Sequence, residues 1–234
     1  MKTTIQDKTK LVNSVFSTVH KKYDLMNDVM SLGIHRIWKN KLLDWMNPQK
    51  TETLIDVASG TGDVAKLYSS RIKNTSKIAC VEPNKKMLKI GKSNLKKFGN
   101  IKWYNSFAET LPFEDDTFNF YTISYGIRNV SNINLSLKEA YRVLKPGGRF
   151  MCLEFSKIDN EILNHIYQQY SKIIPFIGKY IVGEAQPYEY LVKSISEFYS
   201  QDELVTLMRK NSFSNIEYRN LSNGISAIHS GWKV

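Results

Sequence analysis

The feature that most constrains the fold is a short apolar run that leads into a glycine-containing turn and then into a helix. Residues 53–58 have the composition of a strand buried on both faces, and residues 63–71 have helical spacing. Between them, Gly60 and Gly62 lack Cβ atoms, so the chain can turn sharply and a ligand can approach the backbone at the helix N-terminus. Such ligands bind at the carboxyl ends of parallel strands. The segment therefore predicts a parallel sheet with a ligand site after its first strand.

The alternation of strand and helix continues downstream, as in a doubly wound α/β domain. We expect strands at residues 77–81, 101–104, 118–125 and 149–155, and helices at residues 84–98 and 132–144. Residues 145–148, Lys-Pro-Gly-Gly, predict a stop and a turn. Upstream, residues 9–45 predict two helices broken near residues 31–33. After the fifth strand we expect a helix at 160–173, an irregular and partly helical insert at 175–199, a helix at 201–211, and a closing β-hairpin of residues 213–221 and 224–232.

Composition narrows the class of protein. A chain of 234 residues supports one substantial core, and no stretch approaches the roughly 18 apolar residues of a membrane-spanning helix, so a cytoplasmic protein is expected. Cys80 and Cys152 lie in apolar runs and are expected to be packed free thiols. The net charge of +11 is compatible with nucleic acid, an anionic membrane or an acidic substrate. Much of that excess comes from lysines in residues 85–97, which are expected to form a solvated helix face.

The glycine turn alone leaves two kinds of cofactor open. Gly60 to Ala65 fits the dinucleotide pattern GxGxxG/A, and Glu82 follows Gly60 by 22 residues, near the position of a ribose-binding carboxylate, so NAD is one candidate. However, an acid, Asp56, ends the first strand, and no residue of the loop would neutralise a phosphate. A carboxylate at Asp56 suits the methionine ammonium of S-adenosylmethionine better than it suits a pyrophosphate. Glu82 would then accept the ribose hydroxyls, and residues 107–109 after the third strand would face the adenine.

Longer motifs carry a resemblance to a known family. Three segments resemble successive motifs of class I S-adenosylmethionine-dependent methyltransferases, namely residues 56–63, 108–113 and 142–150. Four more resemble the ubiquinone/menaquinone biosynthesis C-methyltransferase family, namely residues 23–28, 31–39, 126–130 and 153–156. The resemblance runs from about Val12 to Lys233. It implies a Rossmann-like fold with a seven-stranded, mostly parallel sheet whose last strand is antiparallel, in a single domain. Its parts would be an N-terminal helical cap at residues 1–50, cofactor-binding β/α units at 51–156, and a substrate-side insert, helix and hairpin at 157–234.

The resemblance also implies site residues. Family contacts to the cofactor fall at the positions of Thr61, Glu82, Phe107, Ala108 and Ser124, which join Asp56, Gly60 and Gly62 as the expected cofactor site; no metal is expected. Family members commonly have Asp where Glu82 stands, which keeps the carboxylate. They commonly have Asn where Phe107 stands, which leaves only stacking or backbone contacts at that position.

The implied reaction is methylation of a ring carbon of a polyprenyl quinol, which needs a positive group near the developing phenolate and a proton acceptor. Arg128 is the candidate for the first role. Tyr23, His35 or a water held by Asn129 and Tyr23 is the candidate for the second. Further expectations are peripheral contact with an anionic membrane at its inner face, participation in a quinone-biosynthesis complex, and a homodimer.

Two alternatives stay open on the sequence. A methyltransferase acting on RNA would suit the basic charge, but the chain has no Asn-Pro-Pro-Tyr-type loop and no cysteine near Ser124, so no nucleic-acid partner is expected. A catalytically inactive scaffold is the other alternative, and intact Asp56, Gly60, Gly62 and Glu82 argue against it.

Overall fold

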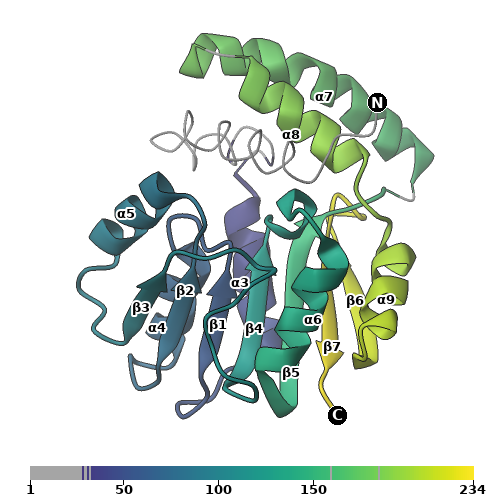
Figure 1. Cartoon of the computed structure of the whole chain (residues 1–234). Helices are drawn as coiled ribbons and strands as arrows, with labels where there is room; N and C mark the ends of the chain where they lie inside the picture. Colours follow the sequence, from purple (N-terminus) through teal and green to yellow (C-terminus); the bar gives the residue numbers. More distant parts are fainter. Residues whose placement is uncertain (1–27, 29–30, 32, 159, 184) are drawn as a thin grey trace.

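The computed structural model describes residues 28, 31, 33–158, 160–183 and 185–234. Its centre is a seven-stranded sheet with strand order β3-β2-β1-β4-β5-β7-β6 (Figure 1). The strands are β1 (Leu54–Val57), β2 (Ile78–Val81), β3 (Ile101–Tyr104), β4 (Phe118–Ser124), β5 (Leu144–Phe155), β6 (Ser214–Leu221) and β7 (Ser226–Trp232). Strands β1 to β5 pair in parallel, and β7 is antiparallel to both of its neighbours. The expected mostly parallel sheet with an antiparallel last strand is confirmed.

The core lies in two layers because successive residues of a strand point to opposite faces of the sheet. Leu54 packs with helices α3 (His35–Met46) and α4 (Asp63–Arg71), whereas its neighbour Ile55 packs on the other face with α6 (Ile133–Val143) and α9 (Gln201–Lys210). Both residues are fully buried. Strands covered on both faces in this way are continuous apolar runs, which is why the sequence located them.

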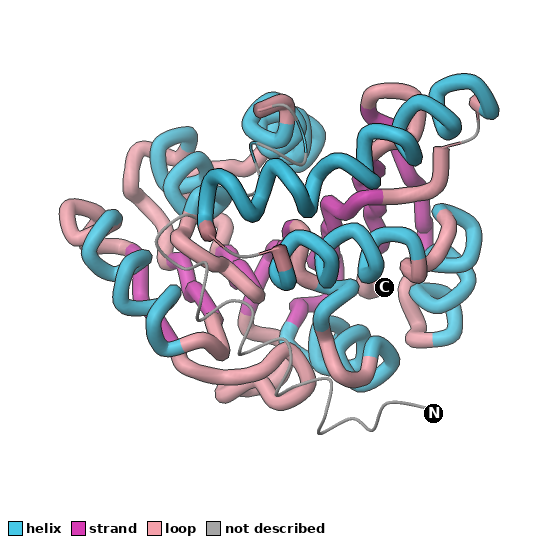
Figure 2. Tube along the Cα trace, turned by 90° about the horizontal axis from the view of Figure 1, so that it is seen from above, coloured by secondary structure: helices cyan, strands magenta, loops and turns pink. Residues whose placement is uncertain are grey.

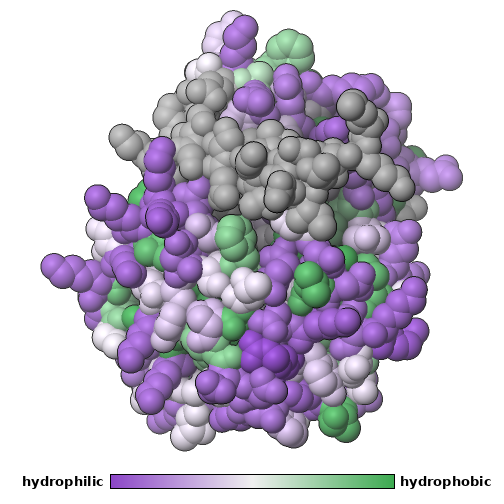
Figure 3. Space-filling model, viewed as in Figure 1, coloured by the Kyte–Doolittle hydropathy of each residue, from purple (hydrophilic) through white to green (hydrophobic). Residues whose placement is uncertain are grey.

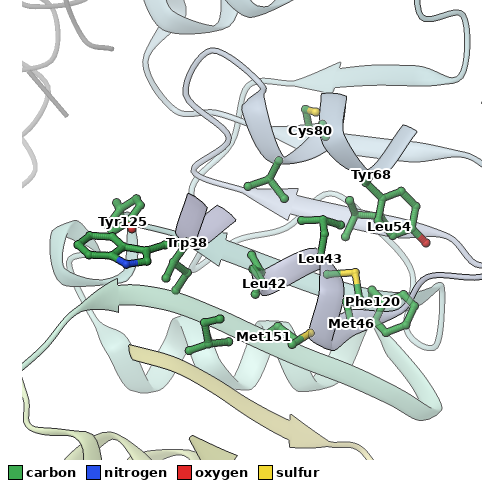
Figure 4. Packing of buried hydrophobic residues seen from close by; sticks show 14 of the residues in the cluster. Trp38, Leu42, Leu43, Met46, Leu54, Tyr68, Cys80, Phe120, Tyr125 and Met151 are labelled. Atoms are coloured by element: carbon green, nitrogen blue, oxygen red, sulfur yellow. The ribbon is translucent and has the colours of Figure 1, made fainter. Parts of the chain in front are cut away.

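Helix α3 belongs to the first of these layers rather than forming a separate lid. Its side chains Leu42 and Leu43 are fully buried in one cluster with Tyr68 of α4 and Met151 of β5 (Figure 4). Burial of each contributes about 1.5 to 3 kcal/mol. The remainder of the expected cap, residues 9–27, lies outside the described residues.

Residues 175–199 differ from expectation. Helix α7 (Glu161–Val182) continues through Pro175, and α8 (Gln186–Ser196) follows it, so the helical part of the prediction is confirmed and its irregular part is wrong. A Cβ atom on Gly178 would lie 2.1 Å from the Tyr188 ring, so the glycine lets that ring pack directly on the α7 backbone. This contact between two helices stabilises a segment in which proline and glycine locally predict a break. The two helices lie side by side over the carboxyl end of the sheet (Figures 1 and 2).

Smaller differences occur at two turns. Strand β5 begins at Leu144, which pairs with Phe118, and the register shifts before Arg149 pairs with Phe120, so the predicted stop is an irregularity within a longer strand. The hairpin closes at the pair Leu221–Ser226, so its connection is longer than the two residues expected.

The surface agrees with the sequence-based expectations. Helix α5 (Lys85–Asn94) begins at the N-cap Asn84, and the lysines of residues 85–97 are exposed. The surface over α5, at the left of Figure 3, is accordingly hydrophilic. Cys80 and Cys152 are buried free thiols. Among the described helices, none has the length and apolar character needed to cross a membrane.

Candidate active site

Asp56 places an unusual carboxylate at the carboxyl edge of the sheet. It lies in β1 between Cys80 of β2 and Thr122 of β4, and its side chain is buried. Oδ1 accepts a hydrogen bond from Thr122 Oγ1 at 2.8 Å, whereas Oδ2 has no hydrogen-bond partner among the described residues. Burial raises the pKa of this carboxyl to about 7, against the lowering effect of the Thr122 hydroxyl. The unpartnered oxygen is therefore prepared to accept from a cationic donor.

The loop after β1 is shaped by left-handed backbone conformations. Gly60 has φ 58° and Gly62 has φ 91°, and Gly62 is the N-cap of α4. A Cβ atom at Gly62 would lie 2.5 Å from Cδ1 of Leu95 and 3.1 Å from the Trp103 ring, so a side chain there would force these neighbours to shift. Both glycines predicted from the sequence are thus required by conformation, and Gly62 also by packing.

Glu82 organises this loop from the end of β2. Its Oε2 accepts from the Gly60 N–H at 2.9 Å and its Oε1 from the Asn84 N–H at 2.8 Å. Burial raises the pKa of Glu82 to about 7, although both backbone hydrogen bonds lower it. Each oxygen of an ionised carboxylate has two lone pairs, so these bonds fix the carboxylate and leave acceptor capacity for hydroxyl donors.

A pocket opens between this loop and the end of β4. Its lining includes the predicted residues Asp56, Thr61 and Ser124, together with Tyr125, Asp63 and Lys39. The Ser124 Oγ is buried and has no hydrogen-bond partner among the described residues. Two orphaned polar oxygens, Asp56 Oδ2 and Ser124 Oγ, thus belong to residues that line one pocket. Buried polar oxygens without a partner indicate a ligand that brings hydrogen-bond donors.

Lys39 is the one positively charged residue among the described residues that line this pocket, and the sequence did not predict it as a site residue. Its side chain is 8% exposed, and its Nζ donates to Asp63 Oδ2 at 2.7 Å. The available signal was a lysine one position after Trp38, on the face of α3 that carries buried Leu42 and Leu43.

Two other predicted cofactor residues follow β3. Ala108 is 6% exposed, whereas Phe107 is 42% exposed. Neither lines the pocket beside Asp56. Glu109 does not face an open site, because its Oε1 accepts from the backbone N–H groups of Ser131 and Asn132.

Arg128 and Asn129 lie in the short helix η1 (Ile127–Asn129) directly after β4. The Arg128 Nη1 donates to Glu154 Oε1 at 2.5 Å and to the Tyr125 carbonyl at 2.7 Å, and both charged side chains are almost completely buried. Burial raises the pKa of Glu154, against the lowering effect of Arg128. Tyr125 connects the Arg128–Glu154 pair to the pocket, because its carbonyl accepts from Arg128 and Tyr125 also lines the pocket.

The remaining catalytic candidates are not among the described residues that line the pocket beside Asp56. Asn129 Oδ1 accepts from the Tyr190 hydroxyl of α8 at 2.9 Å. His35 is buried, and its Nε2 lies 2.9 Å from Asp28 Oδ1. Burial lowers the pKa of His35. Tyr23 lies outside the described residues. Among the side chains that the structure describes, there is no group of three or more His, Cys, Asp or Glu that could hold a metal ion.

Comparisons with known proteins agree with this geometry. The family model of the ubiE/COQ5 methyltransferase family matches residues 2–233. The ubiquinone/menaquinone biosynthesis C-methyltransferase UbiE of Brucella abortus (strain S19) is 45% identical over 97% of this chain and 87% of its own length. That of Brucella anthropi is 46% identical over 97% of this chain and 89% of its own length.

Solved structures share the fold. An S-adenosylmethionine-dependent methyltransferase from Thermotoga maritima aligns with a TM-score of 0.66 at 22% identity, over 94% of this chain and 99% of that one. A Haemonchus contortus phosphoethanolamine N-methyltransferase 2, solved with S-adenosyl-L-methionine, aligns with a TM-score of 0.61 at 13% identity, over 84% of this chain and 52% of that one.

The glycine turn left two cofactors open, and these comparisons decide the choice in favour of S-adenosylmethionine and against NAD. An acid near the end of β1 that lines the pocket, and a second acid after β2 that holds the Gly60 N–H of the same loop, suit S-adenosylmethionine. The chain belongs to the ubiE/COQ5 methyltransferase family and is an S-adenosylmethionine-dependent methyltransferase.

Proposed function

We propose that this enzyme methylates a ring carbon of a polyprenyl quinol. The acceptor is demethylmenaquinol, which becomes menaquinol, or 2-polyprenyl-6-methoxy-1,4-benzoquinol, which becomes its 3-methyl product, or both. The observation that carries the proposal is 45% identity to ubiquinone/menaquinone biosynthesis C-methyltransferases over 97% of the chain. Incubation with labelled cofactor and each quinol separately, followed by mass analysis, tests which ring is methylated.

We assign the cofactor site to residues at the ends of four neighbouring strands, β3, β2, β1 and β4. Asp56 would accept from the methionine ammonium and Glu82 from the ribose hydroxyls, with Gly60 and Gly62 shaping the loop. Thr61 and Ser124 would complete the polar lining, and Phe107 and Ala108 would contact the adenine from the loop after β3. Bound S-adenosylmethionine supplies an electrophilic sulfonium methyl group.

The protein's part in the chemistry is to hold the ring carbon in line with that methyl and to favour the deprotonated quinol. We assign the electrostatic role to Arg128, whose guanidinium is fixed by Glu154 and the Tyr125 carbonyl. Asn129 would orient a water or the quinol hydroxyl, with Tyr23 or His35 as candidate proton acceptors. Arg128 itself is a poor base because it stays protonated.

A test of Arg128 must avoid leaving Glu154 charged and alone, since breaking a buried pair costs about 3 to 5 kcal/mol. The double variant Arg128→Met/Glu154→Met removes both charges. We expect it to bind S-adenosylhomocysteine normally and to lose quinol turnover. The matched control is Arg142→Met/Glu139→Met, which removes a more exposed pair with a 2.6 Å contact and is expected to keep turnover. Wild-type turnover in the Arg128 double variant would contradict the assignment.

We further propose that the enzyme works at the inner face of the membrane, where its lipid substrate resides. Helix α7 carries an exposed apolar stripe at helical spacing: Ile162, Ile166, Ile173, Phe176 and Tyr180, which are 54% to 93% exposed. Lys172 and Lys179 on the same helix are also exposed. Apolar and basic side chains together on one helix favour an interface with anionic lipid.

Vesicle co-sedimentation tests this docking. The protein should bind vesicles with anionic lipid at low salt more tightly than neutral vesicles, and Ile166→Ser/Phe176→Ser should weaken that binding. The control Ile37→Ser removes an equally exposed isoleucine from α3 and should not. Equal sedimentation with both vesicle types would refute the proposal. The homodimer and the quinone-biosynthesis complex stay predictions, for which light scattering and copurification are the measurements.

A further inference from the structure

Lys39 is a buried cation beside the cofactor loop, and it belongs neither to the proposed catalytic residues nor to the proposed cofactor-binding residues. Helix α3 places it in the pocket that also contains Asp56, Thr61 and Ser124. Of the described residues that line this pocket, Lys39 is the only positively charged one. Ionisable side chains are rarely buried to this extent unless they are paired, and Lys39 has a partner in Asp63 at 2.7 Å. Asp63, by contrast, is 40% exposed, so this ion pair alone does not require the lysine to be buried in the pocket.

The order of the strands gives the cofactor a direction across the sheet edge. Glu82, assigned to the ribose, ends β2, and residues 107–108, assigned to the adenine, follow β3 on the outer side. The methionine half must then extend the other way, toward β1 and β4. Asp56 and Ser124 lie on those strands, and Lys39 lines the pocket with them.

We propose that Lys39 binds the carboxylate of the methionine half of S-adenosylmethionine while Asp56 binds its ammonium. A methionine end carries one group of each sign, and the pocket offers one cationic side chain, Lys39, and one acidic side chain, Asp56, whose Oδ2 has no partner among the described residues. A lysine ammonium has three N–H donors, so the bond to Asp63 leaves two for a ligand. Asp63 is then a positioning residue that holds the Nζ at the pocket.

The net charges are complementary. Lys39, Asp56 and Asp63 together carry one excess negative charge when both acids are ionised, and S-adenosylmethionine carries one excess positive charge.

The proposal also changes the role of the N-terminal region. The segment at residues 31–39 was identified only by its resemblance to the quinol C-methyltransferase family, and its last residue would now connect α3 to the cofactor. Cofactor binding would thus stabilise the helix that precedes the sheet.

The test uses two ligands that differ only in the carboxylate: S-adenosylhomocysteine and its decarboxylated analogue, S-adenosyl-3-thiopropylamine. Calorimetry gives the affinity of each for the wild type and for Lys39→Met. The wild type should bind the decarboxylated analogue about 10- to 100-fold more weakly, as expected for loss of a charge-assisted hydrogen bond. In Lys39→Met the two ligands should bind with nearly equal affinity. No methyl acceptor is involved, so the result is independent of the proposed quinol substrate.

Two controls separate recognition from structure. Lys66→Met removes an exposed lysine that also acts on the Asp63 carboxyl, and it should keep the wild-type ratio of affinities. Lys39→Arg keeps the charge and should retain part of the preference for the carboxylate, which covers the case in which Lys39→Met does not fold. If Lys39 only supported the fold, both ligands would weaken equally and the ratio would not change. An unchanged ratio in Lys39→Met, or no preference in the wild type, overturns the proposal.

Discussion

Replacing Asp56 with Asn should make the ligand-free protein more stable at high pH and should weaken its hold on the cofactor. The carboxyl has a pKa of about 7 in the folded chain, compared with 3.8 as its ordinary value, mainly because it is buried. An acid whose pKa is higher in the folded state destabilises that state as the pH rises between the two values. Ligand-free wild-type protein should therefore lose stability at this site between about pH 4 and pH 7.

The magnitude follows from the size of that shift. Each pKa unit corresponds to about 1.4 kcal/mol, so between pH 5 and pH 8 Asp56 costs about 2 to 3 kcal/mol. Asn has nearly the same shape and keeps an oxygen to accept from Thr122, but it has no charge. Glu82 titrates in the same range and is present in both proteins, so the comparison removes its own contribution and leaves the Asp56 contribution, which includes the smaller effect of Glu82 on the Asp56 pKa.

Urea unfolding at pH 5 and pH 8 measures this effect. The fall in unfolding free energy between the two values should be about 2 to 3 kcal/mol smaller in Asp56→Asn than in the wild type. At pH 8 the variant should bind S-adenosylhomocysteine about 10- to 100-fold more weakly, because the ammonium loses its anionic partner. Asp44→Asn, which changes an exposed carboxylate on α3, should alter neither quantity. An identical pH dependence in Asp56→Asn and wild type would refute the reasoning.

Two further predictions concern packing. Arg149 stacks on Trp45 with its guanidinium 4.9 Å from the ring centroid. It lies at the amino-terminal end of the parallel strands, opposite the end that carries the proposed cofactor site. Arg149→Met should therefore lower the unfolding free energy by about 2 to 3 kcal/mol without changing ligand affinity. Loss of affinity in calorimetry would contradict this separation. Gly62→Ala should cost more stability than Gly147→Ala, because both residues have positive φ but only Gly62 would place its Cβ against Leu95. Equal urea midpoints for the two alanine variants would show that the close approach is not limiting.

The sequence predicts the parts of the fold that depend on local patterns. The strands that became β1, β2 and β4 are apolar because they are covered on both faces, and α5 is capped by Asn84, the residue at which the sequence predicts that helix to begin. It does not predict that α7 continues through Pro175, because the packing of Tyr188 on Gly178 joins two different helices. The helix propensity of the local sequence contains no information about such a contact between distant residues.

The same distinction applies to the site. Asp56 and Glu82 could be chosen because each ends a recognisable strand near the glycine turn. Lys39 could not, because its partner Asp63 is 24 residues away on another helix. The pairing of Arg128 with Glu154, 26 residues apart, was equally hidden, and it limits what a single Arg128 variant can show.

The measurement that tests the central claim most directly is the fate of a labelled methyl group. Purified enzyme is incubated with S-adenosylmethionine labelled in its methyl carbon and with demethylmenaquinol or the methoxy-benzoquinol, each kept reduced, and the products are examined by mass spectrometry and carbon NMR. We predict that one or both quinols receive a single label on a ring carbon, and that Asp56→Asn greatly slows the transfer at subsaturating cofactor. Label on a quinol oxygen, or no transfer to either ring by an enzyme that binds S-adenosylhomocysteine, would contradict the account.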